Sequence, residues 1–268
     1  ASNAALAEEP GAALQYGATE GYNPLREQLA AFMTSKGAKD VVADNLIVTT
    51  GSQQALDLLG KTLISPGDKV IVEGPTFLAT IQCFRLYGAE LISAPIDGNG
   101  VKTDELEKLV AEHKPKFVYL IPTFGNPSGA MLSAERRKAV LEMAVKHNTL
   151  IVEDDPYGDL YFGDAPPPSL LNLSATVPGS RELLVHCGSL SKVLSPGLRV
   201  GWMIAPAELL GKATMCKQFS DAHTSTFAQA TAAQYLKAGR MPGTLAHVRK
   251  VYAERAQAMG DALRKELG

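Results

Sequence analysis

Short apolar segments alternate with helical patterns along most of this chain, and this alternation is the feature that most restricts its fold. Several of the apolar segments have no polar side, as expected for strands of a sheet that is covered on both faces. The segments that we predict to be strands are Leu46–Thr49, Lys69–Glu73, Glu90–Ala94, Phe117–Ile121, Leu150–Glu153, Leu183–Cys187 and Arg199–Ile204. The sequence therefore predicts an α/β fold, with three αβα layers around a mostly parallel, seven-stranded sheet.

Helix start and stop signals lie between these segments. Asn23-Pro24 places a proline at the first position of a helix that would stop at Gly37. Thr103 and Ser133 are expected to begin two further helices. From about residue 208 the alternation ends, and long helices are expected up to the last residue.

The composition is that of an ordinary globular protein and excludes several classes. The 268 residues are 46% hydrophobic and 20% charged, with a net charge of -2, so no basic surface for nucleic acid or for a membrane is predicted. Three cysteines lie far apart, as is typical of a reducing cytoplasm, and five scattered histidines have no metal-ligand spacing, so no metal site is predicted. The first residue is not methionine, so we expect a processed, trimmed or partial chain.

Ligands of open α/β sheets bind beyond the carboxyl ends of the strands, so the residues that follow each strand are the first candidates for a site. Gly51-Ser52-Gln53 follows the first strand and opens a helix, where free N–H groups form an anion site, although a turn with a serine cap is the simpler interpretation. Residues 122–129 follow the fourth strand and read as a loop, in which Asn126 could offer an amide donor. Residues 153–155 are three acids after the fifth strand, and they need a partner cation unless two of them are solvated.

The segment His186–Trp202, HCGSLSKVLSPGLRVGW, carries the strongest signal. Lys192 stands among serines in a tight loop between two apolar strands, and Arg199 follows seven residues later. An isolated lysine of this kind is usually a solvated surface residue. Lys192 does not stand alone, however. Pyridoxal phosphate would use this lysine together with the anion site, Asn126, Asp154 and Tyr157, which follows Asp154 by three residues. That cofactor has a phosphate, a phenolic oxygen, a ring nitrogen and an aldehyde that a lysine binds as a Schiff base.

The sequence resembles the fold type I pyridoxal-phosphate enzymes, and in particular the class I/II aminotransferases, over nearly the whole chain. It is most similar to the branch that includes 2-aminoadipate and aromatic aminotransferases, and to the aminotransferase-like half of MocR-type regulators. The motifs that carry the resemblance are LQYGATEGYNPLREQLA, TTGSQQALDLL, GPTFLA, NPSG, EDDPYGDL and SLSKVLSPGLRVGW. The resemblance implies a large cofactor-binding domain over residues 1–240. Residues 241–268 would then be a helix that leads into a C-terminal small domain, which is largely missing.

The resemblance also implies a role for each matching residue. Lys192 would bind the cofactor aldehyde and shuttle protons, and Asp154 would pair with the ring nitrogen. Asn126 and Tyr157 would hydrogen-bond the phenolic oxygen, and Phe77 would stack on the ring. The phosphate ligands would be Gly51, Ser52, Gln53, Ser189, Ser191 and Arg199, together with Tyr16 from the partner subunit of a homodimer with shared sites. Family members extend further at both ends, and nothing after residue 240 matches the arginine that binds their substrate's α-carboxylate.

We therefore expect a cytoplasmic, homodimeric aminotransferase of amino-acid metabolism that uses pyridoxal 5′-phosphate. It would transfer an amino group between an amino acid and a 2-oxo acid, and the sequence does not show which amino acid is the donor. One alternative is another reaction on the same scaffold, such as β-elimination or decarboxylation. A second alternative is a MocR-type transcriptional regulator that senses the cofactor, which would need a winged helix–turn–helix upstream of this chain.

Overall fold

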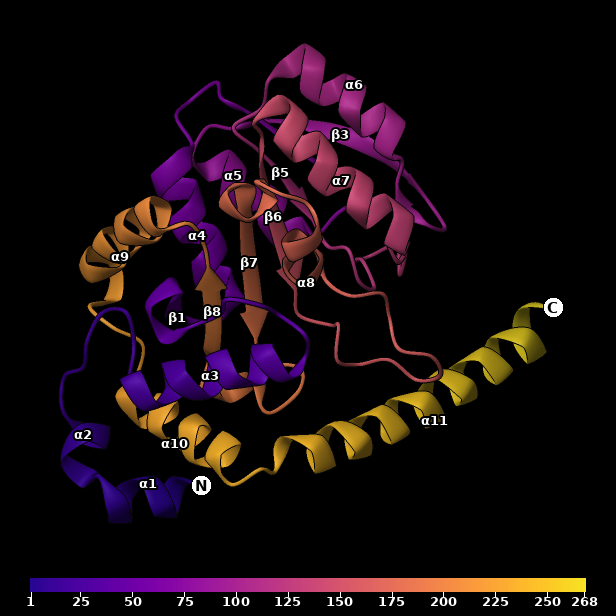
Figure 1. The fold of residues 1–268 in the computed structure, drawn as a ribbon. Coiled ribbons are helices and arrows are strands. Elements are labelled where there is room, and N and C mark those ends of the chain that lie inside the picture. The colour runs from indigo at the N-terminus through magenta and orange to yellow at the C-terminus, as the bar shows by residue number, and fades with distance from the viewer.

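The computed structural model describes residues 1–268, which fold around one eight-stranded sheet (Figure 1). The strands are β1 (Leu46–Thr50), β2 (Lys69–Gly74), β3 (Glu90–Asp97), β4 (Gly100–Val101), β5 (Phe117–Leu120), β6 (Leu150–Asp155), β7 (Leu184–Ser189) and β8 (Val200–Ile204). They lie in the order β1-β8-β7-β6-β5-β2-β3-β4. The neighbours from β7 to β3 are all parallel, whereas β8 is antiparallel to β7 and β1, and β4 is antiparallel to β3.

The mostly parallel, three-layer fold predicted from the sequence is confirmed, with one strand more than predicted. All seven predicted strands are present, with ends that differ by a few residues. The additional strand is β4, which pairs with the end of β3 through Ile96–Val101 and Asp97–Gly100. Two residues carry no periodicity, so the hydrophobic pattern gives no signal for such a short edge strand.

Helices cover both faces of the sheet. One face packs against α3 (Asn23–Ser35), α6 (Thr103–His113), α7 (Ala134–His147), α8 (Leu170–Leu173) and α10 (Thr226–Lys237). The other face packs against α4 (Ser52–Leu63), α5 (Leu78–Leu86) and α9 (Ala207–Asp221). Neighbouring strand residues such as Ile71 and Val72 belong to different cores, because successive side chains of a strand point to opposite faces.

The predicted helix starts agree with the observed ones. Pro24 lies in the first turn of α3, where its missing N–H costs no intrahelical hydrogen bond. The Ser133 hydroxyl accepts a 3.3 Å hydrogen bond from the Arg136 N–H and so caps α7. Short 3₁₀ helices connect other elements: η1 (Ala43–Asn45), η2 (Ser174–Thr176), η3 (Ser180–Leu183) and η4 (Pro196–Leu198).

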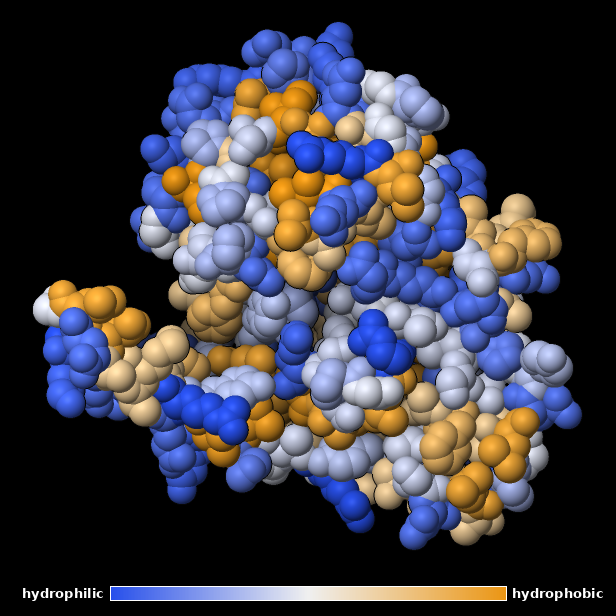
Figure 2. Space-filling view, turned by 180° about the vertical axis from the view of Figure 1, so that it is seen from behind, coloured by the Kyte–Doolittle hydropathy of each residue, from blue (hydrophilic) through white to orange (hydrophobic).

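The N-terminal helices pack against the body of the protein, whereas the C-terminal helix extends away from it. At the N-terminus, α1 (Ser2–Glu8) and α2 (Pro10–Leu14) pack against α10. At the C-terminus, α11 (Met241–Leu267) extends from the body as a long arm (Figure 1). Seen from behind, apolar atoms gather near the tip of this arm (Figure 2), where Met259, Leu263 and Leu267 are exposed. None of the helices combines the length and the hydropathy that a membrane crossing needs.

Candidate active site

A cavity of about 290 Å³ opens where the carboxyl ends of the parallel strands meet. Most of the residues predicted from the sequence line it: Ser52, Gln53, Phe77, Asn126, Asp154, Tyr157, Ser189, Ser191, Lys192 and Arg199. They come from the ends of β6 and β7, from the segments that follow β1, β2, β5, β6 and β7, and from the residue just before the antiparallel strand β8. The topology of the sheet thus brings residues that are far apart in the sequence to one place.

Glu153 points away from this cavity, although it precedes Asp154 directly. Its Oε1 accepts a 2.7 Å hydrogen bond from the Leu170 N–H, and its Oε2 lies 2.8 Å from Nδ1 of His186 and 3.1 Å from the Leu171 nitrogen. Burial raises the pKa of Glu153, but the hydrogen bond and charge of His186, with smaller favourable contributions, outweigh burial and leave the pKa below its ordinary value. Glu153 is therefore a structural carboxylate on the opposite face of β6.

Asp154 lies on the cavity side of β6 and is almost completely buried. Its Oδ2 accepts a 2.7 Å hydrogen bond from the Tyr119 hydroxyl, whereas its Oδ1 is buried without any hydrogen-bond partner. The pKa of Asp154 is raised to about 6, mainly by burial and also by the negative charge of Asp155, against the hydrogen bond from Tyr119 that lowers it. A buried carboxylate oxygen without a donor costs free energy. The carboxyl group therefore suits a ligand that brings a proton donor or a positive charge.

Tyr119 is a site residue that the sequence did not reveal. It lies inside β5, is fully buried, and accepts a 3.1 Å hydrogen bond from the Thr80 hydroxyl while it donates to Asp154. Burial holds the pKa of Tyr119 well above its ordinary value, so the phenol remains a neutral donor. The only signal in the sequence is general: a tyrosine within a buried strand needs a partner for its hydroxyl.

Gly51 and the first turn of α4 form a cradle that the side chain of Arg199 closes. Gly51 precedes the helix with a φ of 74°, in the left-handed region that favours glycine. A Cβ at this position would lie 2.4 Å from Nη2 of Arg199, so a side chain here would displace the guanidinium. Gly51 itself does not line the cavity, but the cradle that it begins does. A helix N-terminus with a guanidinium beside it binds anions such as phosphate.

The positive charge of Arg199 is not neutralised within the chain. Its Nη1 has only two long contacts, 3.5 Å to the Ser191 hydroxyl and 3.4 Å to the Pro196 carbonyl, and no carboxylate pairs with it. The Ser189 hydroxyl accepts a 3.1 Å hydrogen bond from the Ser191 N–H and so folds the loop tightly. An unpaired guanidinium beside two hydroxyl groups can form charge-assisted hydrogen bonds to an anion.

Lys192 lies at the boundary between two cavities. It lines the 290 Å³ cavity and a neighbouring cavity of about 530 Å³, together with Asn126 and Tyr157, whose amide nitrogen and hydroxyl are 3.4 Å apart. The neighbouring cavity is walled largely by the aromatic side chains Phe124, Tyr161, Phe162 and Tyr252. No hydrogen bond or ion pair within the chain occupies the amine of Lys192. It is therefore available to a ligand in either cavity.

Tyr16 does not line the cavity of its own chain. Its side chain is 86% exposed, and its ring packs edge-on against His223 with the centroids 5.8 Å apart. The hydroxyl of Thr226 fixes the segment before it by donating to the carbonyl oxygens of Ala13 and Gln15. Within one chain, Tyr16 therefore makes no contact with the site.

A larger cavity, of about 600 Å³, contains none of the residues predicted from the sequence. It lies between α3, the loop over residues 158–169 and the start of α11. Its cations already have partners, since Lys36 pairs with Asp159 at 2.9 Å and Arg249 stacks on the Tyr161 ring at 3.8 Å. Its size alone does not make it an active site, and the cavity of about 290 Å³ remains the candidate.

An open α/β sheet that presents an anion cradle, an unpaired lysine and a buried carboxylate at one edge is typical of the fold type I transferases. The chain belongs to the aminotransferase class I and II family, whose model matches residues 1–268. This confirms the family resemblance predicted from the sequence.

Similar proteins place the chain within a branch of that family. It is 42% identical to the 2-aminoadipate transaminase of Thermus thermophilus over 98% of this chain and 64% of that protein. It is 39% identical to aromatic-amino-acid aminotransferase 1 of Thermococcus litoralis, over 94% of this chain and 60% of that protein. The crystal structure of the Thermus thermophilus α-aminoadipate aminotransferase with N-(5′-phosphopyridoxyl)-L-leucine superposes with a TM-score of 0.93 at 40% identity, covering 100% of this chain and 67% of that one. The chain thus spans less than two thirds of the length of these two curated relatives.

Proposed function

We propose that the protein is a pyridoxal-phosphate-dependent aminotransferase that moves an amino group between an amino acid and a 2-oxo acid. The observation that carries the proposal is the convergence of Lys192, Asp154 and the Arg199 cradle on one cavity. Family membership and the names of the similar proteins support it.

The residues of the cavity fit pyridoxal 5′-phosphate at each of its polar groups. The buried Oδ1 of Asp154, which has no partner, suits the protonated ring nitrogen, and the unpaired amine of Lys192 suits the aldehyde. Asn126 and Tyr157 suit the phenolic oxygen, and Phe77 suits a face of the ring. The residues that we propose as phosphate ligands are Gly51, Ser52, Gln53, Ser189, Ser191 and Arg199.

The proposed mechanism divides the work between four side chains. When bound, the cofactor supplies a sink for the electron pair that is left on the substrate α-carbon. The carboxylate of Asp154 holds the proton on the ring nitrogen, because a buried charge strongly favours a charged partner. The amine of Lys192 would remove the proton from the substrate α-carbon as a general base and then, as a general acid, deliver it to the carbon of the former cofactor aldehyde. Tyr157 orients the phenolic oxygen together with Asn126.

We also propose that the protein works as a homodimer in which Tyr16 reaches the partner's phosphate. The exposure of Tyr16, and its distance from the cavity of its own chain, support this arrangement. Residues 1–240 would form the large domain, and α11 would lead into a further domain, which is consistent with the greater length of the relatives. The three free cysteines support the cytoplasm as the place of action.

The test is a spectral titration of the intact protein with a panel of amino acids, followed by kinetics with 2-oxo acids. An aminotransferase gives two half-reactions, and each amino donor needs a 2-oxo acid acceptor to complete turnover. Elimination or decarboxylation would proceed without the acceptor. A regulatory domain would bind the cofactor without turnover. Lys192→Ala serves as the inactive control.

A further inference from the structure

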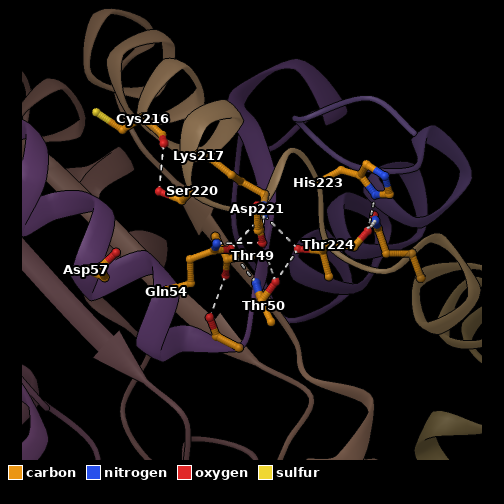
Figure 3. Close-up of polar contacts among 12 residues, drawn as sticks. Thr49, Thr50, Gln54, Asp57, Cys216, Lys217, Ser220, Asp221, His223 and Thr224 are labelled. Carbon is orange, nitrogen blue, oxygen red and sulfur yellow. Dashed lines mark hydrogen bonds and ion pairs between the residues drawn. The ribbon is translucent and has the colours of Figure 1, made fainter. Parts of the chain in front are cut away.

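Lys217 of α9 is completely buried and lies at the centre of a polar cluster beside the anion cradle (Figure 3). Its amine donates hydrogen bonds to Oε1 of Gln54 at 2.8 Å, to both oxygens of Asp221 at 2.8 and 2.9 Å, and to the Thr224 hydroxyl at 3.0 Å. With Thr50, these residues make up what we call the Lys217 cluster. None of its members lines the proposed active-site cavity.

The Lys217 cluster includes Thr50 and Gln54, which directly precede and follow Gly51–Gln53, the residues of the cradle that we propose as phosphate ligands. The Thr50 N–H donates to Oε1 of Gln54 at 2.8 Å, so the chain before the cradle is tied to the chain after it. Both flanking side chains also reach Oδ2 of Asp221, the Thr50 hydroxyl at 2.9 Å and Nε2 of Gln54 at 2.7 Å. The cradle is thereby tied at both ends to the C-terminal turn of α9.

The energetics of the cluster favour a geometric role over a purely stabilising one. Burying an ammonium group is costly, and its pairing with Asp221 offsets that cost without making the pair more stabilising than well-packed apolar side chains would be. The cradle, in contrast, is coupled to the guanidinium of Arg199: a Cβ at Gly51 would lie 2.4 Å from Nη2, so a shift of this backbone toward the guanidinium would displace it. A rigid support on the far side of the cradle keeps this approach in place.

We propose that Lys217 is a positioning residue for the phosphate group of the cofactor. Through Gln54 and Asp221 it fixes the backbone of Gly51–Gln53, so that the N–H groups of the cradle and the guanidinium of Arg199 meet the phosphate together. This inference rests on the proposed function, since it assumes that the cradle holds the phosphate of pyridoxal phosphate. It adds a role for a residue that touches neither cofactor nor substrate.

A second lysine provides a matched control. Lys61 also joins α4 to α9, since its amine lies 2.7 Å from Oδ2 of Asp57 and 3.0 Å from the Ser220 hydroxyl. It differs from Lys217 in being partly exposed and in lying near the other end of α4, away from the cradle. A variant that lacks the Lys61 amine therefore loses a lysine contact between the same two helices, α4 and α9, while the contacts of the cradle stay unchanged.

The experiment compares two probes, pyridoxal 5′-phosphate and pyridoxal, which lacks the phosphate. Dissociation constants are measured for the intact protein and for Lys217→Met, Gln54→Met and Lys61→Met. We expect Lys217→Met and Gln54→Met to weaken binding of pyridoxal phosphate by about tenfold or more, because charge-assisted hydrogen bonds to the phosphate become misaligned. Binding of pyridoxal should stay within about twofold in every variant, and Lys61→Met should bind both probes as the unchanged protein does.

If Lys217→Met does not fold, the Gln54→Met variant tests the positioning role instead, because Gln54→Met keeps the ion pair between Lys217 and Asp221. Unchanged binding of pyridoxal phosphate by Gln54→Met, or equal losses for both probes, would overturn the positioning role. If the unchanged protein binds neither probe, the proposed function itself is wrong, and the inference falls with it.

Discussion

The phenolic hydroxyl of Tyr119 donates a 2.7 Å hydrogen bond to Oδ2 of Asp154, while Oδ1 of the same carboxyl group is buried without a partner. The two oxygens of one side chain are therefore assigned different tasks. One is held by the adjacent strand β5, and the other is free to meet the ring nitrogen of the proposed cofactor. Because the partner is a neutral phenol, it orients the carboxylate without neutralising it.

Replacing Tyr119 with Phe removes the donor and leaves the ring in place. The carboxylate of Asp154 then loses its only hydrogen bond, so its pKa should rise further above the value of about 6 that it has with Tyr119 present. A hydrogen bond to a charged group contributes about 1.5–3 kcal/mol, which corresponds to an upward shift of about one pKa unit or more. The check is a pH titration of the Asp154 carboxyl by NMR in the cofactor-free protein. An unchanged midpoint would show that Tyr119 is only a packing residue.

Asp154→Asn should stabilise the cofactor-free protein at pH 8. The folded-state pKa of about 6 lies above the unfolded value of about 3.9, so the folded state binds the proton more tightly. Stability therefore falls as the pH rises from about 4 to about 6, by up to about 3 kcal/mol, and stays low above that window. The neutral amide avoids this loss. The check is the free energy of unfolding in urea, measured for both proteins at pH 4 and pH 8. An Asp154→Asn variant that is less stable than the unchanged protein at pH 8 would contradict this prediction.

Glu153→Gln is the matched control, and its effect should have the opposite sign. Glu153 accepts hydrogen bonds from two backbone N–H groups and contacts His186, and its pKa is lowered in the folded state. The contribution of Glu153 to folding stability is therefore present above the pKa that this group has in the unfolded state, and it is lost as the pH falls. Breaking this buried group of contacts should cost about 3 kcal/mol at pH 8.

Gly51→Ala should weaken binding of pyridoxal phosphate by about tenfold or more, because the added methyl group would meet the guanidinium of Arg199. Gly67→Ala is the control for backbone strain. Gly67 also has a positive φ, of 88°, but a Cβ there would meet no atom within 4 Å. Equilibrium dialysis of both variants separates the two effects. Equal losses of affinity would mean that strain, and not the cradle, is responsible.

Tyr16→Phe tests the shared site. If its hydroxyl reaches the partner's phosphate, its loss should reduce cofactor affinity by about tenfold or more without unfolding the protein. Heterodimers of Tyr16→Phe and Lys192→Ala chains give the sharper result. In these, the site with an intact Lys192 receives the intact Tyr16 of the other chain, so it should keep near-normal affinity. A site that behaves like the Tyr16→Phe homodimer would show that the tyrosine acts within its own subunit.

The sequence predicted the fold well because several strands, such as Phe117–Leu120, are apolar on both faces and alternate with helices that have clear start signals. Most of the predicted site residues, though not Gly51 or Tyr16, also line one cavity, since parallel strands bring their carboxyl ends together. Glu153 and Asp154 lie on opposite faces of β6, because successive side chains of a strand point to opposite faces.

Two other features were not predictable, because they depend on contacts between distant segments. Tyr119 has the pattern of a core residue, and its hydrogen bond to Asp154 needs the register between β5 and β6. Lys217 stands in a helix of mixed polarity, and only the packing of α9 against α4 buries its amine beside Gln54. Neither position has a local pattern that distinguishes it from an ordinary core or surface residue.

If the protein binds pyridoxal phosphate as we propose, Lys192 is the residue that bonds to it, and the most direct measurement of this bond is chemical. The intact protein is loaded with pyridoxal phosphate, reduced with borohydride to fix the cofactor to its lysine, and mapped by peptide mass spectrometry. We expect one pyridoxyl label, on Lys192, and its absence from the Lys192→Ala variant. A label on another lysine of the unchanged protein, or no stable label at all, would contradict it.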